Sequence, residues 1–173
     1  MRFSIALLLS PLAFAQPAVK DPVPQPPPSF AVRPKIVPEV ILEAVALRER
    51  KEKPGAPLQI GEHRNFPKSG FKKGRWTKAA GGTRIWQLAI RSNTAAAMRV
   101  HFTGFQIGSG RLWVHNAKDF GGPYTGAGIH KDGDFWTDTI PGERLVVEYS
   151  PAPRDSTSSL PFTIAKIAHQ WRD

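Results

Sequence analysis

The sequence has 173 residues and contains no cysteine. Without cysteine, a disulfide framework, a thiolate nucleophile, a zinc ribbon and an iron–sulfur centre are all excluded. Long apolar runs are also missing, because no stretch approaches the ~20 residues that a membrane-spanning helix needs. Acidic residues are few, since 14 Asp and Glu stand against 24 Lys and Arg, for a formal charge of +10 at pH 7. This charge favours anionic partners but does not identify a fold.

The first fifteen residues have the pattern of a secretory signal peptide. Arg2 gives a positive start, residues 3–9 are apolar, and a small-x-small cleavage pattern ends at Ala15. We expect cleavage between Ala15 and Gln16. The absence of cysteine excludes a lipoprotein anchor, so the mature chain is expected to be secreted or periplasmic, without a membrane span.

Proline is concentrated near the N-terminus. Eleven of the 17 prolines lie between positions 11 and 57, whereas fourteen of the 15 glycines lie beyond residue 60. Proline fixes its own φ and lacks a backbone donor, so a proline-rich stretch does not suit the middle of a sheet. We therefore predict an extended, polyproline-like tether over residues 16–37, with the folded domain in the C-terminal two thirds of the chain.

Residues 38–53 carry the local signals of an α-helix. Pro38 lies in the first turn, Glu39 follows it, basic residues come late, and Pro54 and Gly55 end the pattern. One face of this helix would be apolar and would have to dock on something. The sequence does not decide whether that face packs on the chain's own domain or on a partner.

Residues 54–173 have the pattern of short strands separated by turns. Alternating apolar runs occur at 85–91, 98–103, 112–115, 135–138, 145–149 and 162–168. Glycine-rich turns are predicted at 108–110, 121–123 and 141–142. Seven or eight such strands predict an all-β fold, an antiparallel and jelly-roll-like β-sandwich, which should fold without metal, disulfide or cofactor. Because strand residues alternate between faces, one of Phe135 and Trp136 should be buried.

Catalytic constellations are scarce. A serine hydrolase needs a serine on a sharp, glycine-flanked turn, together with a histidine base and an acid. Ser109 is the only serine between two glycines, and a strand-joining turn explains it more simply. His101 and His115 fall on predicted polar strand faces and would suit a metal pair only as neighbours with further ligands. Two surface histidines are the simpler interpretation, so we expect a non-enzymatic chain.

Asp132 and Asp134 flank Gly133 and form the one candidate for calcium. Two carboxylates at this spacing could turn toward one Ca²⁺ ion. The third acidic position and the distal glutamate of an EF-hand loop are absent. The pattern therefore favours an Asp-Gly hairpin turn, with calcium binding as the weaker alternative and no other metal site expected.

Positive charge is densest between positions 67 and 81, around two aromatic residues. The candidate partner surface there, the basic segment, consists of Lys68, Lys72, Lys73, Arg75, Trp76 and Lys78. Bases interleaved with aromatics can bind a polyanion. An acidic glycan, an envelope polymer or an acidic protein surface is more available to a secreted chain than nucleic acid, which is not expected as a partner. A plain solvated loop is the simpler interpretation.

Several short phrases follow one another over residues 57–172. They are PLQIG at 57–61, WQLAIRS at 86–92, AAMRVHF at 96–102, LWV at 112–114, GPYT at 122–125, GDFWT at 133–137, IPGERLVVEY at 140–149 and IAHQWR at 167–172. In this order they resemble the non-catalytic N-terminal β-sandwich region that precedes the peptidase domain in secreted bacterial trypsin-like serine proteases of the lysyl endopeptidase type. The resemblance implies a propeptide-like or accessory domain that aids the folding of a peptidase, or restrains it, by protein–protein contact. We expect a monomer.

Two departures limit what the resemblance implies. The closing phrase of that family usually reads His-Gly-Tyr-Arg and leads into the peptidase domain, whereas here Gln170 and Trp171 replace the glycine and tyrosine and the sequence ends at Asp173. We therefore expect the peptidase domain to be absent, and no catalytic residue is carried over. Two alternatives stay open, namely a secreted binding module for an anionic glycan or envelope polymer, and a truncated protease remnant.

Overall fold

The chain is described by a computed structural model. It covers residues 24–31, 36–43, 55, 58–153, 155 and 158–171. The predicted signal peptide over residues 1–15 and its cleavage site between Ala15 and Gln16 lie outside the described residues. Among the described residues, no helix is long and apolar enough to cross a membrane.

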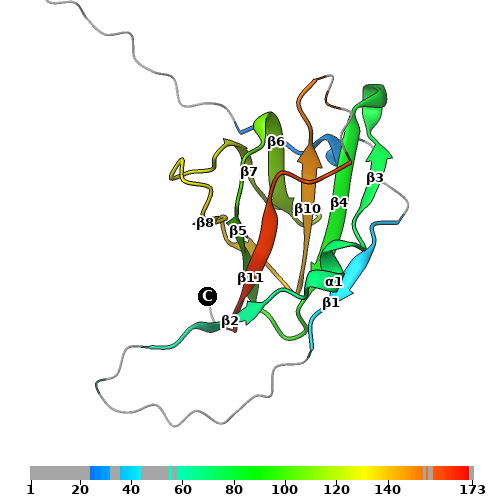
Figure 1. Ribbon diagram of the computed structural model, residues 1–173. Coiled ribbons are helices and arrows are strands. Elements are labelled where there is room, and N and C mark those ends of the chain that lie inside the picture. The colour runs from blue at the N-terminus through cyan, green and yellow to red at the C-terminus, as the bar shows by residue number, and fades with distance from the viewer. Residues whose placement is uncertain are drawn as a thin grey trace, which may run out of the picture.

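The described residues form two β-sheets (Figure 1). Sheet A has the strand order β1-β4-β10-β6-β7, and β3 also pairs with β4. Its strands are β1 (Glu39–Ile41), β3 (Arg75–Lys78), β4 (Arg84–Arg91), β6 (Gly108–His115), β7 (Phe120–Gly126) and β10 (Arg144–Ser150). Sheet B has the order β2-β11-β5-β8, and β9 also pairs with β5. Its strands are β2 (Gly61–Asn65), β5 (Ala97–Thr103), β8 (Phe135–Trp136), β9 (Ile140–Pro141) and β11 (Thr163–Gln170).

Every strand pair is antiparallel except β1 with β4, which is parallel. This arrangement confirms the predicted antiparallel β-sandwich. Helical structure in the described residues is limited to α1 (Lys68–Phe71) and two 3₁₀ turns, Pro28–Phe30 and Ala80–Gly82. The core lies between the sheets, where alternate strand residues point inward. In β5, for example, Met98 and Val100 are fully buried, while Arg99 between them is partly exposed.

The helix predicted for residues 38–53 is wrong at Glu39–Ile41, which form strand β1. Val40 is 3% exposed and Ile41 is 61% exposed, which is the alternation of a strand and not the period of a helix. β1 lies parallel to β4, with Glu39 opposite Ala89. The strand forms because β4 has a free edge whose backbone groups need partners, and tertiary pairing overrides local helix signals. The rest of the predicted helix, residues 44–53, lies outside the described residues.

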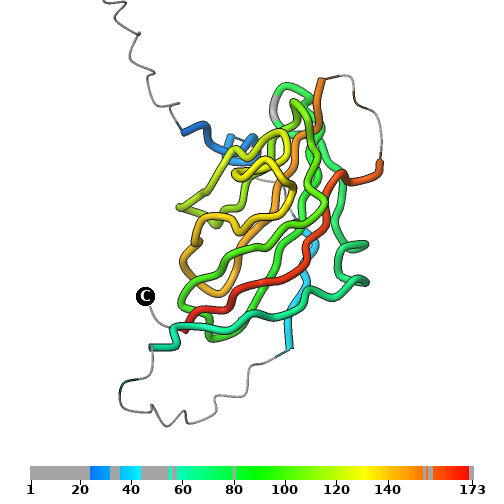
Figure 2. The backbone as a smooth tube through the Cα atoms, turned by 60° about the vertical axis from the view of Figure 1, so that its left-hand side comes forward, coloured from blue at the N-terminus to red at the C-terminus, as the bar shows by residue number. Residues whose placement is uncertain are grey.

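Residues 24–31 of the predicted tether pack on the domain, and we call them the N-terminal strap. Pro27 is extended, with φ −59° and ψ 143°, as polyproline-like structure requires, but Pro28–Phe30 form a 3₁₀ turn. Ser29 is only 4% exposed because it packs on the outer face of sheet A. Figures 1 and 2 show the strap in blue against the sandwich.

Two of the predicted glycine-rich turns lie inside strands. Residues 108–110 begin β6, and residues 121–123 belong to β7. The positive φ of Gly108 and Gly122, +55° and +102°, accompanies irregular register between these two strands. Glycine tolerates such angles without a side-chain clash, so it marks strand irregularities as well as turns.

Candidate partner-binding surfaces

The basic segment forms α1, the turn after it and β3. The side chains of Lys68, Lys72, Lys73, Arg75 and Lys78 are all exposed. No carboxylate of a described residue forms an ion pair with any of these five cations. The fold holds them at one edge of sheet A because β3 pairs with β4. The segment therefore presents a compact positive surface.

The aromatic residues of the basic segment pack inward. Trp76 is partly buried, its ring centroid lies 6.1 Å from that of Tyr149, and the guanidinium carbon of Arg84 lies 3.7 Å from its ring centroid. Phe71 packs against the buried Trp86 at a centroid distance of 5.5 Å. The segment therefore offers charge to a partner but no free aromatic platform.

The calcium candidates are engaged within the protein. An oxygen of Asp132 accepts a hydrogen bond from the backbone nitrogen of Asp134 at 2.9 Å, and Oδ1 of Asp134 lies 2.6 Å from Nε2 of His101. Gly133 has φ +81°, which suits the bend at this point. Within the described residues, no group of three or more potential metal ligands comes together. The contact of Asp132 stays within the loop, and the contact of Asp134 ties the loop to β5.

His101 and His115 do not form a pair. His101 lies in β5 of sheet B, while His115 lies in β6 of sheet A and is only 5% exposed. The interpretation of both as surface histidines is therefore wrong for His115.

A serine–histidine pair exists at a place that the sequence did not indicate. Oγ of Ser92 lies 2.7 Å from Nδ1 of His169 and accepts a hydrogen bond from Arg64 at 3.0 Å. Burial, together with the charge of Arg64, lowers the pKa of His169. Because Ser92 is 0% exposed and His169 1%, no substrate reaches them. The pair links the end of β4 to β11, so its role is to join the two sheets. Ser109 lies exposed near the start of β6.

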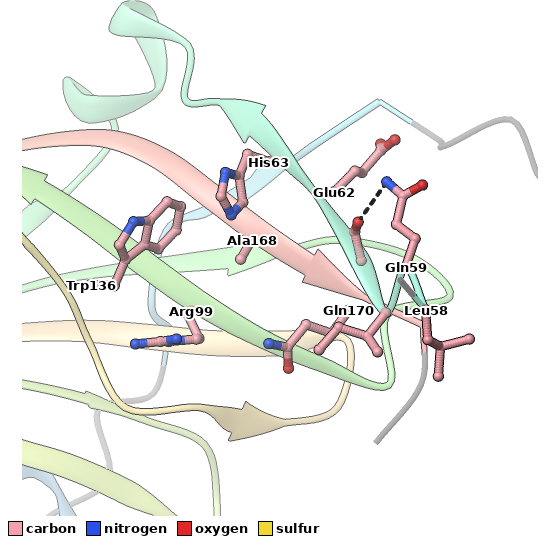
Figure 3. A pocket seen from close by; sticks show the side chains of 10 residues that line it. Leu58, Gln59, Glu62, His63, Arg99, Trp136, Ala168 and Gln170 are labelled. Carbon is pink, nitrogen blue, oxygen red and sulfur yellow. Dashed lines mark hydrogen bonds between the residues drawn. The ribbon is translucent and has the colours of Figure 1, made fainter. Parts of the chain in front are cut away.

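The outer face of sheet B carries an open groove of about 470 Å³ (Figure 3). His63 of β2, Ala168 of β11 and Arg99 of β5 lie opposite one another on three adjacent strands. Figure 3 shows His63 on one side of Ala168 and Arg99 on the other, with Gln170 further along β11. Adjacent strands are ~4.8 Å apart, so the small side chain of Ala168 leaves a gap about 10 Å wide between its longer neighbours. That gap is the floor of the groove.

Trp136 borders this groove and packs against two imidazole rings, those of His63 and His101, which lie far apart in the sequence. Its ring centroid lies 4.5 Å from that of His63 and 4.7 Å from that of His101. Phe135 is 2% exposed and Trp136 is partly exposed, which confirms that one member of this pair is buried. The sequence predicted that one of Phe135 and Trp136 is buried, but not which one. The register of four strands, β2, β11, β5 and β8, was needed to bring His63 to Trp136.

The outer face of sheet A carries a buried carboxylate beneath the N-terminal strap. Glu148 in β10 is 0% exposed. Its Oε1 accepts a hydrogen bond from the backbone nitrogen of Ser29 at 3.0 Å, and its Oε2 accepts one from Gln87 at 2.9 Å. Nε2 of His115 lies 3.2 Å from the same Oε2. Burial raises the pKa of Glu148, but the hydrogen bonds from His115 and Ser29 outweigh it and lower the pKa below its usual value.

Further contacts hold the strap on sheet A. The carbonyl of Gln25 accepts a hydrogen bond from the indole of Trp113 at 2.8 Å, and its side chain accepts one from Arg111 at 2.7 Å. Phe30 places its ring edge-on against His115 and Phe120, at centroid distances of 5.2 and 5.9 Å. The strap therefore covers polar residues in strand positions that normally face water.

The comparisons with known proteins give one finding of similarity. No curated protein and no solved structure matches the chain. The model of one family, the lysyl endopeptidase N-terminal domain, matches residues 36–171. That match begins just before β1 and extends past the end of β11, so it includes every strand of both sheets. It confirms the resemblance found in the sequence, and the chain belongs to the lysyl endopeptidase N-terminal domain family.

Proposed function

We propose that this chain is a secreted, non-catalytic, propeptide-like domain that contacts a serine peptidase of the lysyl endopeptidase type. The observation that carries the proposal is the family match over residues 36–171, which concerns an N-terminal domain and not a peptidase domain. Contact with the peptidase would either help it to reach its folded state or restrain its activity.

The basic segment is the surface that we propose for this contact. Its five exposed cations lack carboxylate partners among the described residues, so they keep their full charge for a partner. Charges of one sign on one surface steer an oppositely charged protein toward it and fix its orientation. The partner surface would accordingly be acidic.

A refolding experiment tests the proposal. The peptidase domain of a lysyl endopeptidase is refolded from denaturant with and without an equimolar amount of this chain, and the yield of active enzyme is measured. The initial rate of hydrolysis by native peptidase is measured in parallel. A higher yield supports the role of folding aid, and a lower rate supports restraint. No effect on either quantity overturns the proposal.

Charge-reversal variants locate the contact. Lys72→Glu with Lys73→Glu inverts the middle of the basic segment, and Lys118→Glu with Lys131→Glu makes the same charge change at exposed positions elsewhere. We expect the first pair to remove the effect on the peptidase and the second pair to keep most of it. Equal effects of both pairs would show that the basic segment is not the contact.

Binding of an anionic glycan or envelope polymer is a second candidate function, favoured by the same unpaired cations. Retention on a heparin column tests it, because binding through several cations weakens steeply as the salt concentration rises. Retention that needs high salt for elution, and that Lys72→Glu with Lys73→Glu abolishes, supports this function. Elution at low salt contradicts it.

A further inference from the structure

Arg99 lines the groove on the outer face of sheet B. Its guanidinium group has no carboxylate partner among the described residues. Nε of Arg99 donates a hydrogen bond to the backbone carbonyl of Thr137 at 2.7 Å, which fixes the direction of the guanidinium group. Within the described part of the chain, no carboxylate forms an ion pair with Arg99. A guanidinium group held in this way can still donate two parallel hydrogen bonds to a carboxylate.

The carboxylates near Arg99 are already engaged. Glu62 lines the groove on β2, two strands away from Arg99, and has an interaction of its own. Asp134 is paired with His101. Lys166, which lies opposite His101 on β11, is exposed on the same sheet. Arg99 is therefore a charge of the groove that no carboxylate of the described residues neutralises by direct contact.

The other end of the groove is aliphatic. Leu58 and Ile60 line it and are 60% and 45% exposed, which is unusual for side chains of this size in a folded domain. They precede β2, which pairs with β11 on one side and has no second strand partner among the described residues. Extended peptides commonly bind to an open strand edge, with their side chains in neighbouring apolar pockets.

We propose that this groove binds an extended peptide that presents a carboxylate to Arg99 and an apolar side chain to Leu58 and Ile60. His63 lies across Ala168 from Arg99, Trp136 borders the groove beyond Arg99, and Ala168 leaves the space that the peptide occupies. A saccharide suits the groove less well, because saccharides have no aliphatic side chain to cover Leu58 and Ile60. This inference does not rest on the proposed contact with a peptidase.

A peptide panel tests the proposal. The probe is a fluorescein-labelled peptide of about ten residues with two Asp-Leu pairs in a Gly-Ser background, and binding is followed by fluorescence anisotropy at low salt. Control peptides carry Asn-Leu pairs or Asp-Ser pairs. We expect the Asp-Leu peptide to bind most tightly, since the other two lack either the carboxylate or the apolar side chain. Equal binding of all three peptides would overturn the proposal.

Matched variants of the chain show where the peptide binds. Arg99→Gln removes one positive charge in the groove, and Lys118→Gln removes one at an exposed position between β6 and β7 of sheet A. We expect Arg99→Gln to weaken binding of the Asp-Leu peptide about tenfold and Lys118→Gln less than about twofold. Equal effects would indicate general electrostatic attraction and contradict the proposal.

A double-mutant cycle separates a direct contact from a loss of folding. If Arg99 meets the peptide carboxylate, Arg99→Gln should weaken the Asp-Leu peptide but not the Asn-Leu peptide. Ile60→Ser, at an exposed position, should weaken the Asp-Leu peptide and leave the Asp-Ser peptide unchanged. Absence of both couplings overturns the proposal. Displacement of the peptide by an oligogalacturonate, with tighter binding that also depends on Arg99, would show a saccharide site instead.

Discussion

The backbone nitrogen of Ser29 donates a hydrogen bond to Oε1 of Glu148, across 119 positions of sequence. Glu148 is 0% exposed, and the strap that carries Ser29 completes its burial. A buried carboxylate is costly unless hydrogen bonds and an opposite charge compensate it. Here Ser29, Gln87 and His115 supply the donors, so the strap and the carboxylate depend on each other.

Glu148→Gln tests this dependence. The substitution keeps the shape of the side chain but removes the charge and replaces one of the two acceptor oxygens by an NH₂ donor. The donors of Ser29, Gln87 and His115 are then left with a single acceptor oxygen. We expect the free energy of unfolding to fall by about 2–4 kcal/mol, as measured by urea denaturation. Glu43→Gln, at an exposed position, is the control and should change stability by less than about 0.5 kcal/mol. Similar values for both variants would contradict the role of Glu148.

Acidification should act through the same carboxylate. The pKa of Glu148 in the folded state lies below its usual value of 4.5, so the unfolded chain takes up a proton first as the pH falls. Its contribution to stability is present above pH 4.5 and is lost as the pH falls through the pKa of the folded state. Urea denaturation between pH 6 and pH 3 should give a shallower pH dependence for Glu148→Gln than for the unaltered chain. Identical slopes would refute this assignment.

We expect stability to depend on pH in a second, higher range because of His169. Burial lowers its pKa below the usual 6.5, so protonation favours the unfolded chain. Stability should therefore decline as the pH falls below about 6.5, and it should level out below the pKa of the folded state. His169→Gln should remove this slope, whereas His130→Gln, at an exposed position, should leave it in place. The test compares slopes, so an overall loss of stability in His169→Gln does not confuse it.

The strand assignment of β1 can be tested with two neighbouring residues. Val40 is 3% exposed and Ile41 is 61% exposed. Val40→Ala should lower the free energy of unfolding by about 1–3 kcal/mol, because it leaves a cavity in the core. Ile41→Ala should have little effect. Comparable losses at both positions would favour a helix or another arrangement in which both side chains are buried.

Sequence periodicity was sufficient for the sandwich strands that have one buried face. The alternation of Met98, Val100 and Phe102 placed β5 correctly, because these residues face the core and those between them face outward. The run Val40-Ile41-Leu42 was ambiguous, since three apolar residues fit either a helix or a strand. Only the free edge of β4 decides between them, and that edge is a tertiary feature.

The burial of Gln87 and Glu148 on the outer face of sheet A, and the groove on sheet B, could not be predicted from the sequence. The reason differs from the one for β1. Polar residues in a strand normally indicate a face in water, so Gln87 and Glu148 gave no sign that the strap covers them. Ala168 has no functional signal of its own, and it matters only because the register places it between His63 and Arg99. The basic segment, in contrast, was visible as a cluster of charges, and the structure keeps those charges exposed.

Direct binding to a peptidase tests the central claim most simply. The chain is titrated into the separately folded peptidase domain of a lysyl endopeptidase in a calorimeter, and the mixture is analysed by size-exclusion chromatography. We predict a saturable complex with one copy of each protein, weakened by salt and by Lys72→Glu with Lys73→Glu, but not by Lys118→Glu with Lys131→Glu. Absence of a complex at every accessible concentration, for both folded and refolding peptidase, would contradict the account.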